Sequence, residues 1–333
     1  MPQHLASPDN RRLWEALAGD GRFFLTFTGL ILILSGLFVI IQSITGHFLP
    51  HDVSYLGLTA QQLSRYHEGK ITHFMFHDRV AFGGSIIAVG CIYMWLVEFP
   101  LKQGQAWAWW LLLLSGITGF GSFLTYLGHG YLDSWHGMAT LMLLPFYSIG
   151  LVRTYARLTG DKSIWDILKV TNHWNFTTRT GIGITLLLFT GFGLFAGGLT
   201  IMFVGMTAVF VPQDLVFMHA TVHQLRQVED HLIPLIAHDR SCFGGGLATI
   251  GLIIFFTIRR AEPTRNLWEI LLVSLTIGFT FALGVHFVIS YTDVTHLLPA
   301  YLGVVTYLSG LGLTFRTWHT QLSQPTPLQQ PEV

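Results

Sequence analysis

The chain has 333 residues, of which 51% are hydrophobic and only 11% are charged. Soluble domains usually carry about 25% charged residues, so this composition is typical of a membrane protein. Its formal net charge is zero, which leaves no basic excess for nucleic acid, and we expect no nucleic-acid partner. The two cysteines, Cys91 and Cys242, lie in apolar stretches without a CxxC motif, so we expect small buried side chains there.

Eight apolar stretches are long enough to cross a bilayer, which takes roughly 20 helical residues. They lie near 23–46, 78–99, 106–128, 135–155, 181–211, 239–258, 267–290 and 296–316. The sequence therefore predicts an all-α polytopic membrane protein in contact with the lipid bilayer. Thirteen lysines and arginines flank one side of these stretches and five flank the other. This bias predicts an inner or cell membrane protein with both termini in the cytoplasm.

The chain also contains an internal repeat, because HDRVAFGG at 77–84 returns as HDRSCFGG at 238–245. Matches at offsets of 159–162 residues join Thr28-Gly29 to Thr190-Gly191, Trp107 to Trp268, Tyr131 to Tyr291, Asp133 to Asp293 and His136 to His296. We predict two parallel four-helix bundles at 22–157 and 180–317. A cytoplasmic segment at 1–21, a cytoplasmic linker at 158–179 and a disordered tail at 318–333 complete the predicted organisation.

Four of the sixteen histidines recur as two repeat pairs, His77 with His238 and His136 with His296. Ionisable groups at membrane spans are costly and usually functional. His77 lies 21 residues from Glu98, or about 30 Å along a helix, and the other three lie at similar depths. We therefore expect all four imidazoles at the outer boundary.

Two facing imidazoles in a helical bundle can ligate haem. We expect haem b between His77 and His136 and between His238 and His296. Another metal, a proton relay or a structural role remain alternatives.

Each histidine of the repeated motif is followed by an aspartate and an arginine, Asp78-Arg79 and Asp239-Arg240. Arginine can pair with a haem propionate, and aspartate can orient an imidazole. The alternative is an interfacial ion pair that anchors the helix end.

Eight helices in two halves, cytoplasmic ends and histidines on the second and fourth helix of each half resemble the heme A synthase family. The resemblance covers about residues 22–317 in architecture and, in sequence, the four histidines with an H-x-R…G pattern. It implies haem ligation by His77, His136, His238 and His296. That family carries a cysteine pair and a glutamate before its second-helix histidine, whereas this chain has no cysteine there. We therefore do not expect it to hydroxylate a haem methyl group.

The predicted outer loops offer further polar residues. Asp52 and Asp214 share the frame T-x-x-F-x-P-x-D, which reads as a turn or helix cap or as a carboxylate that reaches the cofactor. Two tyrosines and two aspartates directly precede the fourth-helix histidines: Tyr131, Tyr291, Asp133 and Asp293. The tyrosines suit the aromatic belt at the membrane interface. The alternative is a functional one, in which each aspartate hydrogen-bonds the nearby histidine.

The second loop also holds a candidate divalent-metal set, composed of His219, His223, Glu229, Asp230 and His231. His219 and His223 stand four apart and would share a helix face. The alternative is an amphipathic covering helix with solvated charges.

Three functions follow. The first is a haem-binding membrane oxidoreductase or electron-transfer protein acting on a quinone or another lipophilic substrate. The second is a non-haem metal-dependent membrane enzyme that uses the second outer loop. The third is a transporter or an assembly or structural subunit.

Overall fold

The computed structural model describes residues 12, 15, 19–170 and 175–320. These residues form helices and loops with no strand, and eight helices are long and apolar enough to span a membrane. The spanning helices are α2 (Arg22–Ile44), α5 (Lys70–Leu96), α6 (Ala106–Ser122), α8 (Ser134–Tyr155), α9 (Arg179–Met206), α12 (Leu232–Arg260), α13 (Arg265–Val288) and α14 (Val294–Thr320). The predicted all-α polytopic membrane fold is confirmed. Residues 318–320 of the predicted tail belong to α14, while 321–333 and most of the N-terminal segment lie outside the described residues.

Short elements connect the spans: α3 (Pro50–Leu56), α4 (Ala60–Leu63), η1 (His67–Gly69), η2 (Val97–Leu101), η3 (Phe123–Thr125), α7 (Tyr126–His129), η4 (Ile164–Leu168), α10 (Pro212–Met218) and α11 (Val222–Val228). Side-chain caps fix where several helices begin. Thr178 accepts from the backbone N–H of Gly181 at α9, and Thr264 accepts from that of Leu267 at α13.

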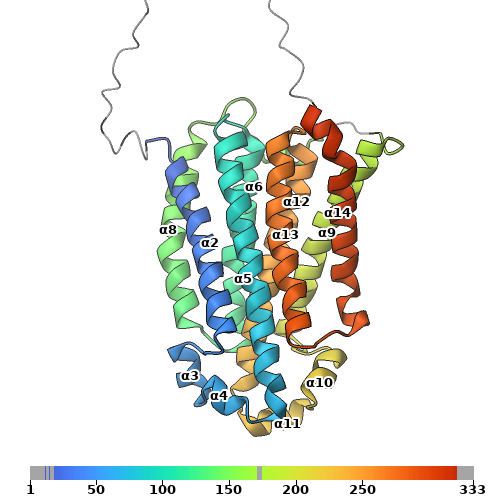
Figure 1. The fold of residues 1–333 in the computed structure, drawn as a ribbon. Coiled ribbons are helices and arrows are strands. Elements are labelled where there is room, and N and C mark those ends of the chain that lie inside the picture. The colour runs from blue at the N-terminus through green and yellow to red at the C-terminus, as the bar shows by residue number, and fades with distance from the viewer. Residues whose placement is uncertain (1–11, 13–14, 16–18, 171–174, 321–333) are drawn as a thin grey trace, which may run out of the picture.

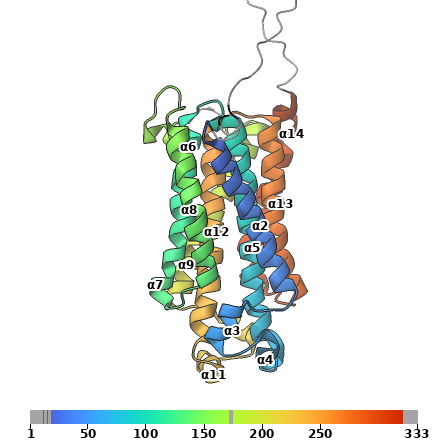
Figure 2. The same ribbon diagram turned by 90° about the vertical axis from the view of Figure 1, so that its left-hand side faces the viewer.

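Helices α5 and α12 form the centre of the molecule (Figures 1 and 2). Their most apolar stretches are 78% and 72% buried, against 22–33% for the other six spanning helices. The outer helices instead expose large apolar side chains such as Ile44 and Leu141. Because such side chains are stable against hydrocarbon, the outer ring is the lipid-facing surface.

Glycines set the close packing of α9 on α12. A methyl group added at Gly198 would lie 2.2 Å from the backbone nitrogen of Ala248, and one at Gly244 would lie 2.5 Å from that of Met202. The same contact recurs between α2 and α5, where Gly36 faces Gly83. Small residues allow membrane helices to approach closely, so each half joins its first and second helices in the same way.

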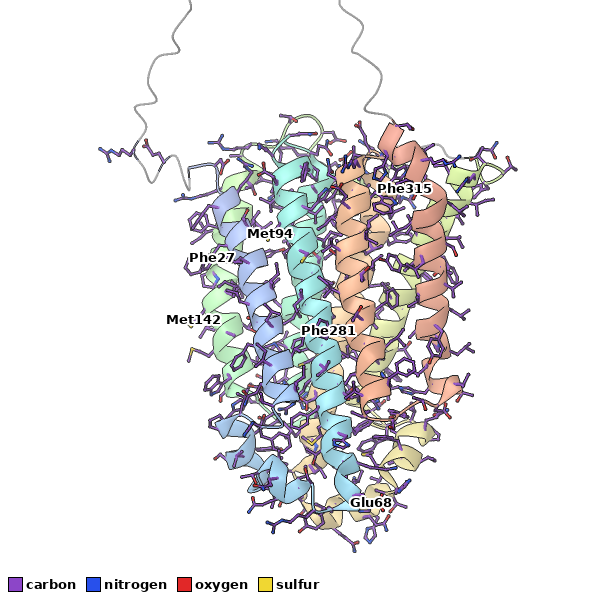
Figure 3. All side chains as sticks on the ribbon, in the orientation of Figure 1. Phe27, Glu68, Met94, Met142, Phe281 and Phe315 are labelled. Atoms are coloured by element: carbon purple, nitrogen blue, oxygen red, sulfur yellow. The ribbon has the colours of Figure 1, made fainter. Side chains whose placement is uncertain are left out.

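The third helix of each half packs on the second helix of the other half. Gly84 of α5 meets the side chain of Phe281 of α13, labelled in Figure 3, and Gly245 of α12 meets Ser122 of α6. Phe281 and Ser122 occupy matching repeat positions at an offset of 159. The two halves are therefore interlocked around α5 and α12 instead of packing as separate bundles.

The short helices α3, α4, α10 and α11 form a cap beyond one end of the bundle, opposite the ends of α2 and α14 that lead to the termini (Figure 1). A second hydrophobic cluster fills this cap, with Leu63, Phe74, Leu225 and Leu235 fully buried. Because the cap supports them, α5 and α12 begin earlier than predicted. His77 and His238 therefore lie about two turns inside their helices, whereas the predicted spans near 78–99 and 239–258 put them directly before the helix starts.

The close contact at Gly198 can be tested with Gly198→Ala. We expect the methyl group to lower the free energy of unfolding by about 1–3 kcal/mol, because it overlaps the backbone of α12. Thermal unfolding of the purified protein in detergent measures the effect. Gly197→Ala is the matched control, since nothing lies within 4 Å of its added methyl group. Equal stability of the two variants would contradict the packing described.

Candidate metal centre and polar network

The two HDR motifs build one reciprocal ion-pair network across the halves. Arg79 donates to Asp52 of its own half and to Asp239 of the other half, both at 2.8 Å. Arg240 donates to Asp214 of its own half at 2.5 Å and lies 3.6 Å from Asp78 of the other. These six side chains are 0–12% exposed. The neighbouring residues of each motif therefore do not pair with each other, because Arg79 pairs with Asp52 and Asp239 while Asp78 faces Arg240.

Asp52 and Asp214 are the outer ends of this network. They lie in the first turns of α3 and α10, and Asp214 also accepts from the backbone N–H of Val211. Tyr131 donates to Asp52 at 2.6 Å, and Tyr291 donates to Asp214 at 2.8 Å. Burial raises the pKa of Asp214, but Arg240 outweighs burial and holds it below its usual value. Both aspartates therefore act within the network, and both tyrosines are buried instead of lying in an exposed belt.

The four repeated histidines meet across the halves. His136 of α8 lies beside His238 of α12, with ring centroids 5.7 Å apart. His77 of α5 meets His296 of α14 and His286 of α13, and one ring nitrogen of each lies within 4.8 Å of the others. The expected pairs, His77 with His136 and His238 with His296, are not the ones brought together. The interlocked packing is the cause. It sets the second helix of each half on the third helix of the other half, which in turn contacts the fourth helix of that other half.

Cys242 completes a group of three ligands with His136 and His238. Its Sγ lies 3.6 Å from His136 Nδ1 and 3.5 Å from His238 Nε2. Metal–sulfur and metal–nitrogen bonds of about 2.3 and 2.0–2.1 Å at tetrahedral angles separate sulfur from nitrogen by about 3.6 Å. Both sulfur–nitrogen distances therefore match those of a tetrahedral centre, and all three ligand atoms lie within 4.8 Å of one another.

Asp133 supports this centre from the loop before α8. Its carboxylate accepts from the backbone N–H of His136 at 2.8 Å and lies 3.4 Å from His238 Nε2 and 2.9 Å from His51 Nε2. Burial lowers the pKa of His51, but the carboxylates of Asp133 and Asp52 outweigh burial and raise it above its usual value. Burial likewise raises the pKa of Asp133, but hydrogen bonds to His238 and His51 outweigh burial and hold the pKa well below its usual value. The Asp133 carboxylate thus places a negative charge beside His51 and His238.

A cavity of about 570 Å³ adjoins the His₂Cys group. Its polar end is lined by Arg79, Asp133, His136, His238 and Cys242. The rest is lined by mostly apolar side chains of α2, α5, α6, α8 and α12, with hydroxyl side chains such as Tyr93 and Ser115 among them. From Arg79 to Tyr93 along α5 the lining extends about 21 Å. Leu34, Phe38 and Trp135 also line it and are 45–52% exposed. The cavity therefore reaches the lipid-facing surface between α2 and α8.

The structure does not bring together the residues of the metal site predicted in the second outer loop. His219 ends α10 with φ 51°, whereas His223 lies in α11, so the two share no helix face. Lys70 approaches His219 Nε2 at 3.2 Å, and His231 pairs with Glu229 at 2.8 Å. Over the part of the chain that the structure describes, no group of potential metal ligands includes His219, His223, Glu229, Asp230 or His231. The loop instead contains the short helix α11, on which His223 is exposed.

Three residues of the site were missed from the sequence: Cys242, His286 and His51. Their repeat counterparts are Ala81, Tyr126 and Gln213, so a search for repeated residues passes over them. The available signal was the spacing of Cys242, which follows His238 by four residues and so lies on the same helix face.

Neither a protein-family model, nor a curated protein, nor a solved structure matches the chain. The resemblance to the heme A synthase family therefore stays an expectation from the sequence. The functional argument depends on the geometry of the site.

The ion-pair network predicts a large effect for Arg79→Gln. This change leaves Asp52 and Asp239 buried without their guanidinium, and we expect the free energy of unfolding to fall by about 3–5 kcal/mol. Reversible unfolding in mixed micelles measures it. Arg65→Gln, at an exposed loop position, should change stability by less than about 0.5 kcal/mol. A loss below about 1 kcal/mol for Arg79→Gln would show that the pairs behave as surface ion pairs.

Proposed function

We propose that this protein is an integral membrane metalloprotein of the oxidoreductase class. Its His136–His238–Cys242 centre would act on a lipophilic molecule held in the adjoining cavity. The observation that carries the proposal is that the ligand group adjoins the cavity, because all three potential ligands line the polar end of this long, mostly apolar space. A metal there would meet the head group of a molecule that enters from the bilayer.

The ligand set favours a transition metal of borderline or soft character. Two imidazoles and a thiolate suit zinc and copper, and the same set serves copper in electron-transfer proteins. Of these two metals only copper changes oxidation state, so the oxidoreductase class requires copper at this centre. A metal held by these three residues would have room for a substrate or water as a further ligand.

The cavity favours a quinone-type molecule as the lipophilic partner. Its length of about 21 Å and its apolar walls accommodate an isoprenoid or acyl chain, while Arg79, Asp133 and the histidines face a polar head. The exposed lining residues Leu34, Phe38 and Trp135 provide entry from the lipid side. Asp133 lies next to the centre with His51 2.9 Å away from it, and a protonated His51 can donate a proton when such a head group becomes negatively charged.

Haem b is the second candidate cofactor, and the size of the cavity beside two histidines is the observation that favours it. The residues fit it less well than they fit a single metal ion. Cys242 Sγ lies within 3.6 Å of a ring nitrogen of both histidines, in the space that a porphyrin would need. The ring of Phe123 lies 4.9 Å from that of His136 on another side. Arg79 is also engaged by two carboxylates that a propionate would have to displace.

The cofactor can be tested with the absorption spectrum of the full-length protein after loading with Cu²⁺. We expect a thiolate-to-copper charge-transfer band, which Cys242→Ser removes because it replaces the sulfur ligand. Cys91→Ser is the control, since Cys91 belongs to none of the candidate ligand groups. A Soret band in protein expressed with ample haem would favour haem instead. A Cu²⁺-loaded spectrum unchanged by Cys242→Ser would contradict the His₂Cys centre.

The cavity can be tested with Gly119→Phe, which places a large ring in its lining. We expect binding of a short-chain quinone analogue, followed by calorimetry in detergent, to weaken by at least tenfold because the space is filled. Gly121→Phe is the matched control on the same helix, since nothing lies within 4 Å of an added methyl group there. Equal binding by both variants would place the lipophilic partner elsewhere.

A further inference from the structure

A second buried group of histidines lies apart from the His₂Cys centre. It joins His77 of α5, His286 of α13 and His296 of α14, and one nitrogen of each lies within 4.8 Å of the others. The rings of His77 and His286 have centroids 4.7 Å apart. The Nε2 atoms of His286 and His296 are 3.4 Å apart.

Two of these rings have their tautomer fixed by backbone carbonyls. His77 Nδ1 lies 2.8 Å from the carbonyl oxygen of Phe74, and His286 Nδ1 lies 2.7 Å from that of Ala282. A carbonyl oxygen can only accept, so each Nδ1 carries the hydrogen. In the neutral imidazole Nε2 is then left with a free lone pair, which is the form that binds a metal.

The third ring is fixed by a chain of hydrogen bonds that ends in the ion-pair network. Tyr291 donates its hydroxyl hydrogen to Asp214 at 2.8 Å. Its oxygen therefore accepts from His296 Nδ1, which lies 3.2 Å away. His296 Nε2 is left with a lone pair that faces the lone pair of His286 Nε2. Two such lone pairs 3.4 Å apart repel each other, and a cation between them removes the repulsion.

The spacing and the local charge both fit a metal ion. Two nitrogens bound at about 2.0–2.1 Å in a tetrahedral site lie about 3.3–3.4 Å apart. Asp78 Oδ1 lies 3.5 Å from His77 Nε2, and Asp78 Oδ2 is buried without a hydrogen-bond partner among the described residues. Asp78 and Asp214 together face one guanidinium, that of Arg240. Two buried carboxyl groups thus face a single guanidinium beside the three imidazoles.

We propose that His77, His286 and His296 form a second metal site, a His₃ centre for a divalent cation that prefers imidazole, such as Zn²⁺. Tyr291 and Asp214 position His296 and contact no metal themselves. Each of the two centres then contains a second-helix histidine of one half and a fourth-helix histidine of the other half. Its third ligand has no identical residue at the matching repeat position. The third ligand is Cys242 in one centre and His286 in the other, so the repeated sites differ in ligand chemistry.

The test is the Zn²⁺ content of the full-length protein in detergent, after chelator treatment and reloading. We expect two Zn²⁺ per chain in the unchanged protein and one in His286→Gln. Cys242→Ser should also retain one, and the double variant should retain none, which separates the two centres. His223→Gln, at an exposed loop histidine, should keep two. A His286→Gln protein that elutes normally and still binds as much Zn²⁺ as the unchanged protein would overturn the proposal, and so would an unchanged protein whose Zn²⁺ is lost entirely with Cys242→Ser.

Tyr291→Phe provides a second readout that does not remove a ligand. It breaks the hydrogen bond that orients His296, and we expect the Zn²⁺ affinity of the His₃ centre to fall by about 10–100-fold in competition with a chelator. The measurement is made on Cys242→Ser, so that only this centre contributes. Tyr131→Phe is the matched control at the repeat position. Equal affinity of the Tyr291→Phe and Tyr131→Phe proteins would also overturn the proposal.

Discussion

The rest of this structure depends on the reciprocal ion pairs that Arg79 and Arg240 form with aspartates of the opposite half. Each guanidinium joins a carboxylate of its own loop to a carboxylate of the opposite central helix. Burying such charges is costly unless they are closely paired, so few relative positions of α5 and α12 satisfy both networks at once. The network therefore fixes the register of the two central helices.

That register determines which histidines meet. His77 and His238 directly precede the paired Asp-Arg residues, so their heights are set by the same contacts. The glycines at Gly84 and Gly245 then admit the third helix of the opposite half. As a result, each histidine group combines residues of both halves, and neither half carries a complete set of ligands. Duplication here produced one interlocked unit with two polar centres at matching positions.

The two centres differ in surroundings as well as in ligands. The His136–His238–Cys242 group adjoins a cavity that reaches the lipid-facing surface, and Asp133 with His51 adds titratable groups beside it. The His77–His286–His296 group is bounded by the aromatic rings of Phe74 and Tyr291, and His77 and His286 donate hydrogen bonds to backbone carbonyls that fix their tautomers. These differences suit the first centre to a substrate and the second to a more rigid, structural or relay role.

The sequence by itself determined the eight spans, the repeat and the importance of the HDR motifs, since hydrophobic length, residue identity and offset are local properties of the chain. It also singled out four histidines at similar depth. Only the tertiary structure decided that His136 meets His238 and that His77 meets His296, because that choice depends on which helices pack together across 100 or more residues. For the same reason, Cys242 and His286 became potential ligands only once the interlocked helices placed them beside the repeated histidines.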